Sequence, residues 1–366
     1  MKGMDNPSQN FRFLLSGHDT VEVCYYLRPL PNCVLDFQEI GFQKEALRQA
    51  KRREPKVIEL GGESFLLKSH GTANGFPFVM ENDAYIVEFG EFNHPSFRVK
   101  FRSQPLWQYG VQFLHRRFLD WAGSVGLYVL QPESLSRVDF TFDYWLPEID
   151  FDEDSMVSLS KKDNKYRDDG KINGLVYGKS DIVLRIYDKV LEIAEQSGKV
   201  WLFQLWGGVS ENVWRIEWQT RQVPLRRFGI RTVDDLMSQQ GDLLRYLATE
   251  HDSLRSKAED SNRSRWPLHP LWQDLIERIK AMECQGVHRV IYAKEVLNER
   301  LMRIAISTYG NLKRIAAIVA AQKESDFTGF KEAAQELQGL LTVVHDPLTW
   351  KNDVDSRIKE IRFGQW

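Results

Sequence analysis

The stretch that decides the fold is a run of β-branched and apolar residues that turns into a helix: Asp181-Ile182-Val183-Leu184-Arg185-Ile186-Tyr187-Asp188-Lys189-Val190-Leu191-Glu192. Alternating apolar and polar side chains predict a strand for its first part, and the residues that follow predict the start of a helix. Tyr187 lies at the joint, with charged residues on both sides. A tyrosine in such a strand ordinarily packs in the core with its hydroxyl hydrogen-bonded, and this interpretation stays open for Tyr187.

Two further segments combine strand patterning with acidic residues: Arg137-Val138-Asp139-Phe140-Thr141-Phe142-Asp143 and Trp214-Arg215-Ile216-Glu217-Trp218-Gln219-Thr220-Arg221. Side chains alternate between the two faces of a strand. Asp139, Asp143 and Glu217 therefore fall on polar faces opposite apolar ones, and Arg185 shares a face with Tyr187. Three such strands can pair into a sheet whose polar face carries carboxylates. A merely solvated surface is the alternative interpretation.

Composition describes an ordinary globular protein. The chain has 366 residues, 42% hydrophobic and 27% charged, which predicts two domains or one domain with a helical appendage. The net charge of -2 gives no overall sign of a polyanionic partner, so any such surface must be local. Three cysteines without a CxxC pair argue against structural zinc and a disulfide framework. Without a long apolar run or a signal-peptide pattern, we expect a cytoplasmic protein and no membrane partner.

The rest of the first 250 residues predicts an α+β fold, with an antiparallel sheet as its core and flanking helices. A hairpin is expected over 11–27, turning at Gly17-His18-Asp19, followed by short strands between 57 and 102 and a helix near 105–125. The very polar segment 147–173 is expected to be an exposed loop.

Composition changes after residue 250. Serines mixed with basic residues predict a linker over 251–266, and the chain from 267 to 366 predicts a separate helical region. Six apolar residues and one threonine recur there at spacings of 4, 3, 4, 4, 3 and 4, which predicts a long amphipathic helix: Leu297, Leu301, Ile304, Thr308, Leu312, Ile315 and Val319. Further helices are expected at about 327–341 and 350–361.

The carboxylates predict a metal site. Mg²⁺ and Mn²⁺ prefer oxygen ligands, and we expect Asp139, Glu217 and, from strand parity, Asp143 to supply them. A metal there could neutralise the charge that develops as a phosphate is attacked. Tyr187 is a suitable nucleophile, but its phenol has an ordinary pKa of about 10, so a nearby cation is needed. Lys189 and Arg185 could supply part of that charge or bind the scissile phosphate.

A cluster of arginines surrounds Phe228-Gly229 and comprises Arg221, Arg226, Arg227 and Arg231. Arginines with an aromatic residue between them favour contact with a nucleic-acid phosphate backbone, although a solvated turn is the alternative. The chain contains no GxxxxGK[ST] loop, so ATP is not implied.

These segments together resemble the replication initiation factor family of rolling-circle plasmids, which includes phage initiators and relaxases of integrative conjugative elements. The resemblance rests on Arg137-Val138-Asp139, on Gly178-x₆-Arg185-Ile186-Tyr187-Asp188-Lys189-x₂-Glu192 and on Trp214-Arg215-Ile216-Glu217. It covers about 85–232. A departure is Tyr177-Gly178-Lys179-Ser180, which replaces a longer Gly/Ser loop.

The resemblance implies a DNA endonuclease that nicks and rejoins one strand at an origin. The family tyrosine, matching Tyr187, attacks that strand, stays linked to the 5′ phosphate and leaves a free 3′ hydroxyl. One divalent metal, Mg²⁺ or Mn²⁺, is held by acidic residues on the neighbouring strands, which Asp139 and Glu217 match best. Origin DNA is the expected partner, and a host helicase and a second copy of the chain are further candidates.

Two other functions remain open. A DNA-binding regulator could use the same scaffold without chemistry, which requires a packed Tyr187 and pairing of Asp139 and Glu217 with arginines such as Arg137 and Arg215. A metal nuclease could instead use water as the nucleophile, with Tyr187 merely structural.

Overall fold

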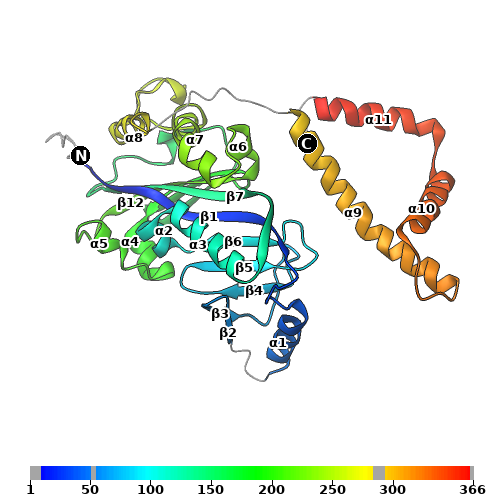
Figure 1. Ribbon diagram of the computed structural model, residues 1–366. Helices are drawn as coiled ribbons and strands as arrows, with labels where there is room; N and C mark the ends of the chain where they lie inside the picture. The colour runs from blue at the N-terminus through cyan, green and yellow to red at the C-terminus, as the bar shows by residue number, and fades with distance from the viewer. Residues whose placement is uncertain (1–9, 51–54, 283–292, 363–366) are drawn as a thin grey trace. The chain divides into compact units, whose positions relative to one another are not determined.

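One antiparallel sheet of eleven strands dominates the computed structural model, in the order β2-β3-β4-β5-β6-β1-β7-β12-β11-β10-β9 (Figure 1). The structure describes residues 10–50, 55–282 and 293–362. The strands are β1 (Arg12–Pro29), β2 (Lys56–Leu60), β3 (Glu63–Leu67), β4 (Phe78–Glu81), β5 (Tyr85–Phe89), β6 (Phe97–Phe101), β7 (Leu127–Trp145), β9 (Asp163–Asp168), β10 (Lys171–Tyr177), β11 (Ile182–Asp188) and β12 (Val213–Arg221). With helices flanking this sheet, the predicted α+β class is confirmed.

The predicted hairpin at the N-terminus is wrong. Strand β1 runs without a turn from Arg12 to Pro29 and pairs with both β6 and β7. The register to β7 shifts between His18 and Thr20, which marks a bulge rather than a reversal. Gly17 serves close packing instead of a turn, since a Cβ built there would lie 2.6 Å from the Trp107 ring. The bulge places Asp19 on the polar face of the sheet, beside Arg215.

The segment 147–173 is also more ordered than predicted. It contains the short helix η1 (Glu153–Ser155), strands β8 (Met156–Ser158) and β9, and the start of β10. Asp169 and Gly170 turn the β9–β10 hairpin with positive φ angles of 45° and 77°. An Asp-Gly pair between two strand-like runs is a strong hairpin signal, and here the polar composition of the segment obscured it.

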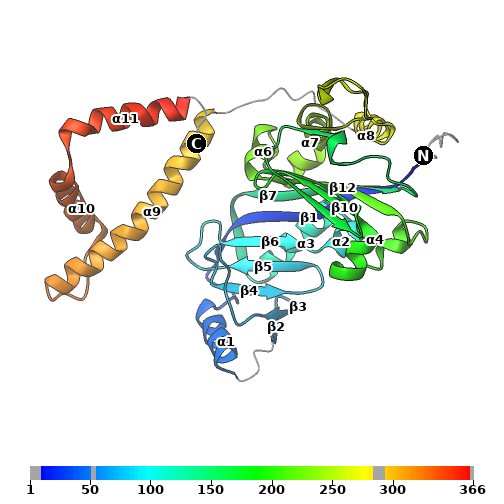
Figure 2. The same cartoon turned by 180° about the vertical axis from the view of Figure 1, so that it is seen from behind.

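Helices cover the apolar face of the sheet. They are α3 (Val111–Ser124), α7 (Val233–Tyr246) and α8 (Pro270–Lys280), and they share one hydrophobic core with the strands. Seen from behind in Figure 2, strands β4, β5 and β6 lie in front of α3. The core residues Trp218 of β12 and Trp272 of α8 are fully buried and pack edge to face with ring centroids 5.6 Å apart. These helices cover the apolar face of the sheet, so the opposite face carries the polar side chains.

A helical excursion between β11 and β12 covers one end of the polar face. It consists of α4 (Lys189–Glu192), the π-helix η2 (Ile193–Ser197) and α5 (Leu202–Leu205). Leu202, Trp206 and Val213 form a small second core there, with Leu14 and Leu15 of β1 packed against it. Helix α2 (Ser103–Tyr109) contributes Trp107, whose ring lies 6.0 Å from the Arg215 guanidinium. The predicted single helix over 105–125 is therefore two helices, which meet at Gly110.

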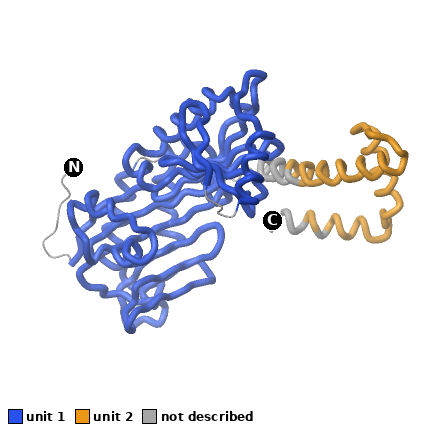
Figure 3. Tube along the Cα trace, turned by 90° about the horizontal axis from the view of Figure 1, so that it is seen from below, with its two compact units in different colours: residues 1–290 blue, residues 291–366 orange. Residues whose placement is uncertain are grey.

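The predicted linker over 251–266 belongs to the first compact unit, which extends to Val290 (Figure 3). Strand β13 (Asp252–Leu254) pairs with β8, and Leu254 is fully buried. Helix α8 is equally part of the core. The boundaries at 250 and 266 are therefore wrong, because the serine-rich composition hid a segment anchored by its apolar residues. The remaining helices of this unit are α1 (Phe37–Gln49), α6 (Gln222–Arg227), η3 (Leu247–His251) and η4 (Arg263–Arg265).

The second unit, residues 291–366, is helical as predicted, with α9 (Ala293–Gln322), α10 (Phe330–Val344) and α11 (Pro347–Arg362). Leu312 and Val319 of α9 are buried, whereas Leu301 and Ile304 from the same predicted stripe are more than half exposed. Within the described part of the chain, no helix combines the length and apolar character that crossing a membrane requires.

Candidate functional site

Tyr187 lies at the end of β11 and is half-buried on the polar face of the sheet. The next residue, Asp188, caps α4 by accepting hydrogen bonds from the backbone N–H groups of Val190 and Leu191. This cap ends the strand directly after the tyrosine, and β12 and β10 hold it on either side. The Tyr187 hydroxyl donates a hydrogen bond to Glu217 Oε2, with an oxygen–oxygen distance of 3.0 Å. The structure thus has the transition from strand to helix at the position predicted from the sequence.

Glu217 connects the tyrosine to an arginine. Its Oε1 accepts a hydrogen bond from Arg185 Nη1 at 3.0 Å, and Arg185 Nη2 also donates to Gln219 Oε1 at 3.0 Å. Glu217 is buried on the central strand β12, whereas the Arg185 side chain is 30% exposed. Burial, followed by the Glu217 charge, holds the pKa of Tyr187 well above its usual value. A free phenolate is therefore scarce near neutral pH, and the proton needs an acceptor at the moment of reaction.

Asp139 lies one strand further, on β7, opposite Gln219 in the register. Its Oδ1 accepts a hydrogen bond from Arg137 Nε at 2.8 Å, and Arg137 contacts the second oxygen as well. Burial raises the pKa of Asp139, the Arg137 hydrogen bond opposes that shift and the Glu217 charge adds to it, and the net pKa is about 7. Asp139 and Glu217 are consequently close enough to repel each other when both are charged.

The structure does not bring Asp143 to this pair. Its carboxylate is fully buried, with Oδ1 at 2.6 Å from Arg215 Nε and Oδ2 at 2.8 Å from Arg215 Nη2. The same Oδ2 accepts the Trp206 indole N–H at 2.9 Å. Strand parity placed Asp143 on the correct face, but its oxygens are enclosed by donors. The described residues contain no group of three or more His, Cys, Asp or Glu side chains that could hold a metal. Asp143 is thus held by Arg215 and Trp206, apart from the other two carboxylates that were predicted to bind a metal.

Lys189 is buried beside the Tyr187 ring. Only 1% of Lys189 is exposed, its ammonium contacts Glu192, and Nζ lies 5.6 Å from the centroid of the Tyr187 ring. Burial, and then the neighbouring Arg215 charge, lowers its pKa. Lys189 can place positive charge beside the ring, but it is too buried to bind a phosphate from solution. Arg185 is the more accessible of the two cations predicted from the sequence.

Sequence reasoning missed two acidic residues of β1. Glu22 contacts Arg98 of β6, and its Oε1 lies 3.8 Å from Arg137 Nη1, so Arg137 stands between Glu22 and Asp139. Asp19 accepts hydrogen bonds from Arg215 Nη1 at 2.9 Å and from Lys199 Nζ at 2.8 Å. The alternation around Val21 and Val23 could have indicated Glu22. Asp19 was hidden because the predicted turn covered it.

The predicted DNA-binding arginines divide into two pairs. Arg221 and Arg227 are exposed, whereas Arg226 and Arg231 are partly buried, and Arg226 donates to Ser134 Oγ at 3.0 Å. Arg221 lies opposite Arg137 in the register of β12 and β7. By strand parity it shares the face of Glu217, at the far end of the strand from Arg215. Arg221 is thus available to a ligand on the polar face, and Arg227 is exposed on helix α6.

No family model matches the chain, and no curated protein matches it. Among solved structures, the chain is similar to a rolling circle replication initiator protein from Geobacillus stearothermophilus, with 19% sequence identity and a TM-score of 0.43. That match covers 75% of this chain and 100% of the other.

Proposed function

We propose that the chain is a DNA strand-nicking and strand-joining enzyme of the replication initiation factor type, with Tyr187 as its nucleophile. The observation that carries the proposal is the hydrogen bond from the Tyr187 hydroxyl to Glu217, on a polar sheet face that also presents Arg185. A nucleophile held by a base, with the base oriented by a third group, is the arrangement that activates weak oxygen nucleophiles. Such an initiator or relaxase would act on DNA in the cytoplasm.

In the proposed reaction, the Tyr187 hydroxyl attacks a phosphodiester while its proton passes to Glu217. A bond forms between the tyrosine oxygen and phosphorus, and the bond from phosphorus to the 3′ oxygen breaks. The leaving oxygen takes back a proton from Glu217 and becomes a 3′ hydroxyl, while the 5′ phosphate stays on Tyr187. The reverse reaction rejoins the strand. Arg185 has a second role as a donor to the phosphate, for which its 30% exposed guanidinium is suited.

We further propose that a divalent cation, Mg²⁺ or Mn²⁺, is held by Asp139 and Glu217. The pair fits this role because each carboxylate feels the charge of the other, which a cation between them relieves. Mg²⁺ sites commonly use one or two carboxylates with water and substrate phosphate completing the shell. Such an ion would supply charge neutralisation at the phosphate. Arg137 and Arg185 would have to loosen their hold on these carboxylates as the ion binds.

A non-catalytic DNA-binding regulator is the second candidate, favoured by the ion pairs. Asp139 is paired with Arg137 and Glu217 with Arg185, so both carboxylates are neutralised by neighbours. A regulator would use such pairs only to hold the sheet together, and Tyr187 only as packing. The difference between the candidates is a covalent bond to DNA.

The experiment is a capture of covalently bound DNA. The full chain is incubated with a pool of random-sequence single-stranded oligonucleotides and Mg²⁺ or Mn²⁺, then denatured, and DNA that stays on the protein is sequenced. We expect enrichment of one sequence and a 5′-phosphotyrosyl adduct at Tyr187 by mass spectrometry. Tyr177→Phe is the matched control and should retain the adduct. Sequence-selective binding without an adduct would establish the regulator, and cleavage without an adduct would indicate water as the nucleophile.

A further inference from the structure

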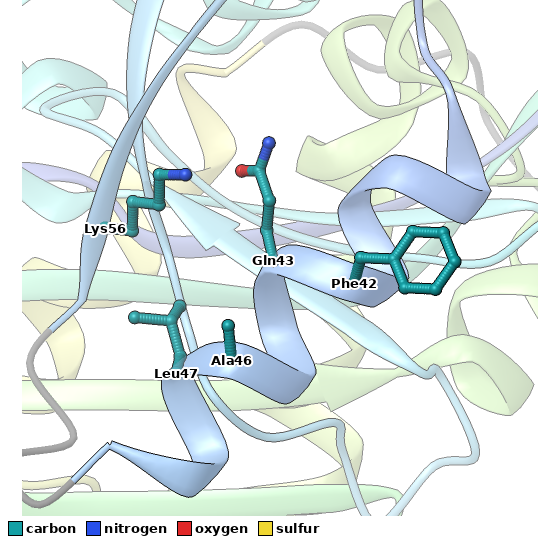
Figure 4. A pocket seen from close by; sticks show the side chains of 5 residues that line it. All are labelled: Phe42, Gln43, Ala46, Leu47 and Lys56. Carbon is teal, nitrogen blue, oxygen red and sulfur yellow. The ribbon is translucent and has the colours of Figure 1, made fainter.

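A hollow lies beside the helical excursion that connects β11 and β12. It has a volume of about 350 Å³, and its wall includes Asn82, Arg102, Ser103, Lys199 and Trp201. The hollow between α1 and β2, by contrast, has a volume of about 380 Å³ and a mostly apolar lining, with Phe42, Ala46 and Leu47 beside Gln43 and Lys56 (Figure 4). Of these two, only the hollow beside Trp201 combines an aromatic ring with two cationic side chains.

A series of hydrogen bonds connects this hollow to Arg215, the residue beside Tyr187 on the neighbouring strand. Lys199 Nζ and Ser103 Oγ, both from its wall, donate to the Asp19 carboxylate at 2.8 and 2.9 Å. Asp19 in turn accepts from Arg215 Nη1 at 2.9 Å. Arg215 is the direct cross-strand neighbour of Tyr187 in the register of β12 and β11. The hollow therefore lies on the same side of the sheet as Tyr187, and Asp19 and Arg215 lie between them.

The wall offers what an unpaired nucleotide needs. Base–aromatic stacking is the main sequence-tolerant contact in single-strand binding, and Trp201 is the only aromatic side chain among the residues that line this hollow. Lys199 and Arg102 bring positive charge for a phosphate. Arg102 Nη2 is paired with Glu81 at 2.9 Å, whereas its buried Nε has no hydrogen-bond partner among the described residues. The Asn82 amide adds hydrogen-bonding capacity, although its side chain also caps the β4–β5 turn. A volume of about 350 Å³ is at the lower end of the range for small-ligand sites.

We infer that this hollow binds one unpaired nucleotide of the DNA strand attacked by Tyr187, with its base stacked on Trp201 and its phosphate near Lys199. The inference rests on the proposed function and adds a subsite to it. Lys199 and Trp201 both belong to the helical excursion between β11 and β12. By binding the nucleotide, this excursion sets the position of the DNA strand relative to Tyr187. Asp83 also lines the hollow, and its negative charge disfavours a phosphate on its side relative to the side of Lys199.

The test uses the Tyr187→Phe chain, so that binding is measured without cleavage. Single-stranded oligonucleotides carry one abasic position, moved stepwise along the sequence selected by the covalent capture. We expect one position at which the abasic change weakens binding roughly tenfold, and we expect that penalty to disappear when Trp201→Ala is added. Trp350→Ala, which removes an exposed tryptophan of the second unit, should leave the penalty unchanged.

A crosslink guards against a variant that fails to fold. In the otherwise unchanged Tyr187→Phe chain, 5-iodouracil at the sensitive position should crosslink to Trp201 on irradiation, located by peptide mass spectrometry. Trp201→Phe keeps a ring and should preserve most of the affinity. Normal single-strand binding with no position-specific effect of Trp201, or a crosslink elsewhere, would overturn the subsite and leave the nicking proposal intact. Absence of any single-strand binding would overturn both.

Discussion

Tyr187 of β11 reaches diagonally to Glu217 of β12, with the phenol hydroxyl 3.0 Å from Glu217 Oε2. The second oxygen of Glu217 is held by Arg185, so the carboxylate cannot rotate away without losing that ion pair. Burial and the Glu217 charge keep the phenol protonated. In the reaction proposed above, this pair transfers a proton during the attack instead of holding a phenolate beforehand.

Tyr187→Phe should abolish nicking and covalent attachment while leaving single-strand binding within about threefold. The change removes only the attacking oxygen and one hydrogen bond, whose net contribution to the free energy of unfolding is about 1 kcal/mol. Gel assays of nicking and urea denaturation measure the two effects. Tyr177→Phe is the control, because the Tyr177 hydroxyl makes one long bond, 3.4 Å, to the Glu153 carbonyl. Covalent attachment by Tyr187→Phe would remove Tyr187 as nucleophile.

Glu217→Gln should slow nicking by about 10²–10⁴-fold, since the amide keeps a hydrogen-bond acceptor for Arg185 but cannot take the tyrosine proton. It should also weaken Mn²⁺ binding, which is measured by electron paramagnetic resonance in the absence of DNA. Asp181→Asn, an exposed acidic residue just before β11, is the control for simple loss of charge. Unchanged Mn²⁺ affinity in Glu217→Gln would exclude Glu217 as a ligand, and unchanged nicking would exclude it as the base.

The polar face could be predicted from the sequence because alternation within a strand needs no knowledge of its partners. Arg185 and Tyr187, Asp139 and Asp143, and Glu217 all lie on the face that parity assigns to them. The role of Asp143 depends instead on register, since Arg215 lies directly opposite it on the neighbouring strand. No property of either segment alone indicates that these two side chains pair.

The β1 residues were missed for a related reason. Gly17-His18-Asp19 has the composition of a turn, yet tertiary contacts keep the chain extended. Trp107 packs where a side chain at position 17 would be, and His18 bonds to Gln240 of α7. Both partners are more than 80 residues away in the sequence. Local propensity was overridden by long-range packing, which single-sequence reasoning cannot include.

Asp143→Ala should destabilise the fold by about 3–5 kcal/mol, because it leaves the buried Arg215 charge without its main partner. It also leaves the Trp206 indole N–H without an acceptor. Urea denaturation in the presence of a metal chelator measures the change, with exposed Asp120→Ala of α3 as the control. A metal ligand would behave in the opposite way, since removing one of several clustered carboxylates relieves repulsion. Unchanged or increased stability would therefore return Asp143 to the metal site.

His18 should make stability depend on pH. Burial lowers the pKa of His18 to about 4, with its hydrogen bond to Gln240 opposing that shift. The unfolded chain binds a proton at an ordinary pKa near 6.5, so it gains more protons than the folded chain between pH 6.5 and 4. Stability from this group is complete above pH 6.5 and falls by on the order of 3 kcal/mol as the pH drops to 4. His18→Gln keeps a donor for Gln240 but does not titrate.

Denaturation of wild type and His18→Gln at several pH values between 7 and 4 isolates this contribution. The difference in free energy of unfolding between the two chains should change in favour of the variant as the pH falls. Other groups also titrate in this range, but they are common to both chains and cancel in the difference. A difference that stays constant with pH would show that His18 titrates normally in the folded protein.

Contacts to DNA phosphates could come from the arginine cluster or from the helical second unit, and two variants distinguish these sources. Residues 291–366 contain 11 Lys and Arg against 10 Asp and Glu, so their net charge is close to zero. A chain ending at Val290 keeps α8, including Trp272, and should melt like the first unit of the full chain. A plot of log affinity for single-stranded DNA against log salt concentration has a slope of about 0.7 per phosphate neutralised. This slope should be the same in the truncated and the full chain, because the nearly neutral second unit is expected to neutralise no phosphates.

Replacing the exposed Arg221 and Arg227 together by Gln should instead lower that slope by about 1.4, since each removes one phosphate contact. The matched control is Lys313→Gln with Arg314→Gln, two neighbouring basic residues of α9, which should leave the slope unchanged. Affinities are measured by fluorescence anisotropy over a series of salt concentrations. A slope reduced by the truncation or by the α9 pair, and not by Arg221 and Arg227, would place the phosphate contacts on the helical unit instead of the sheet face.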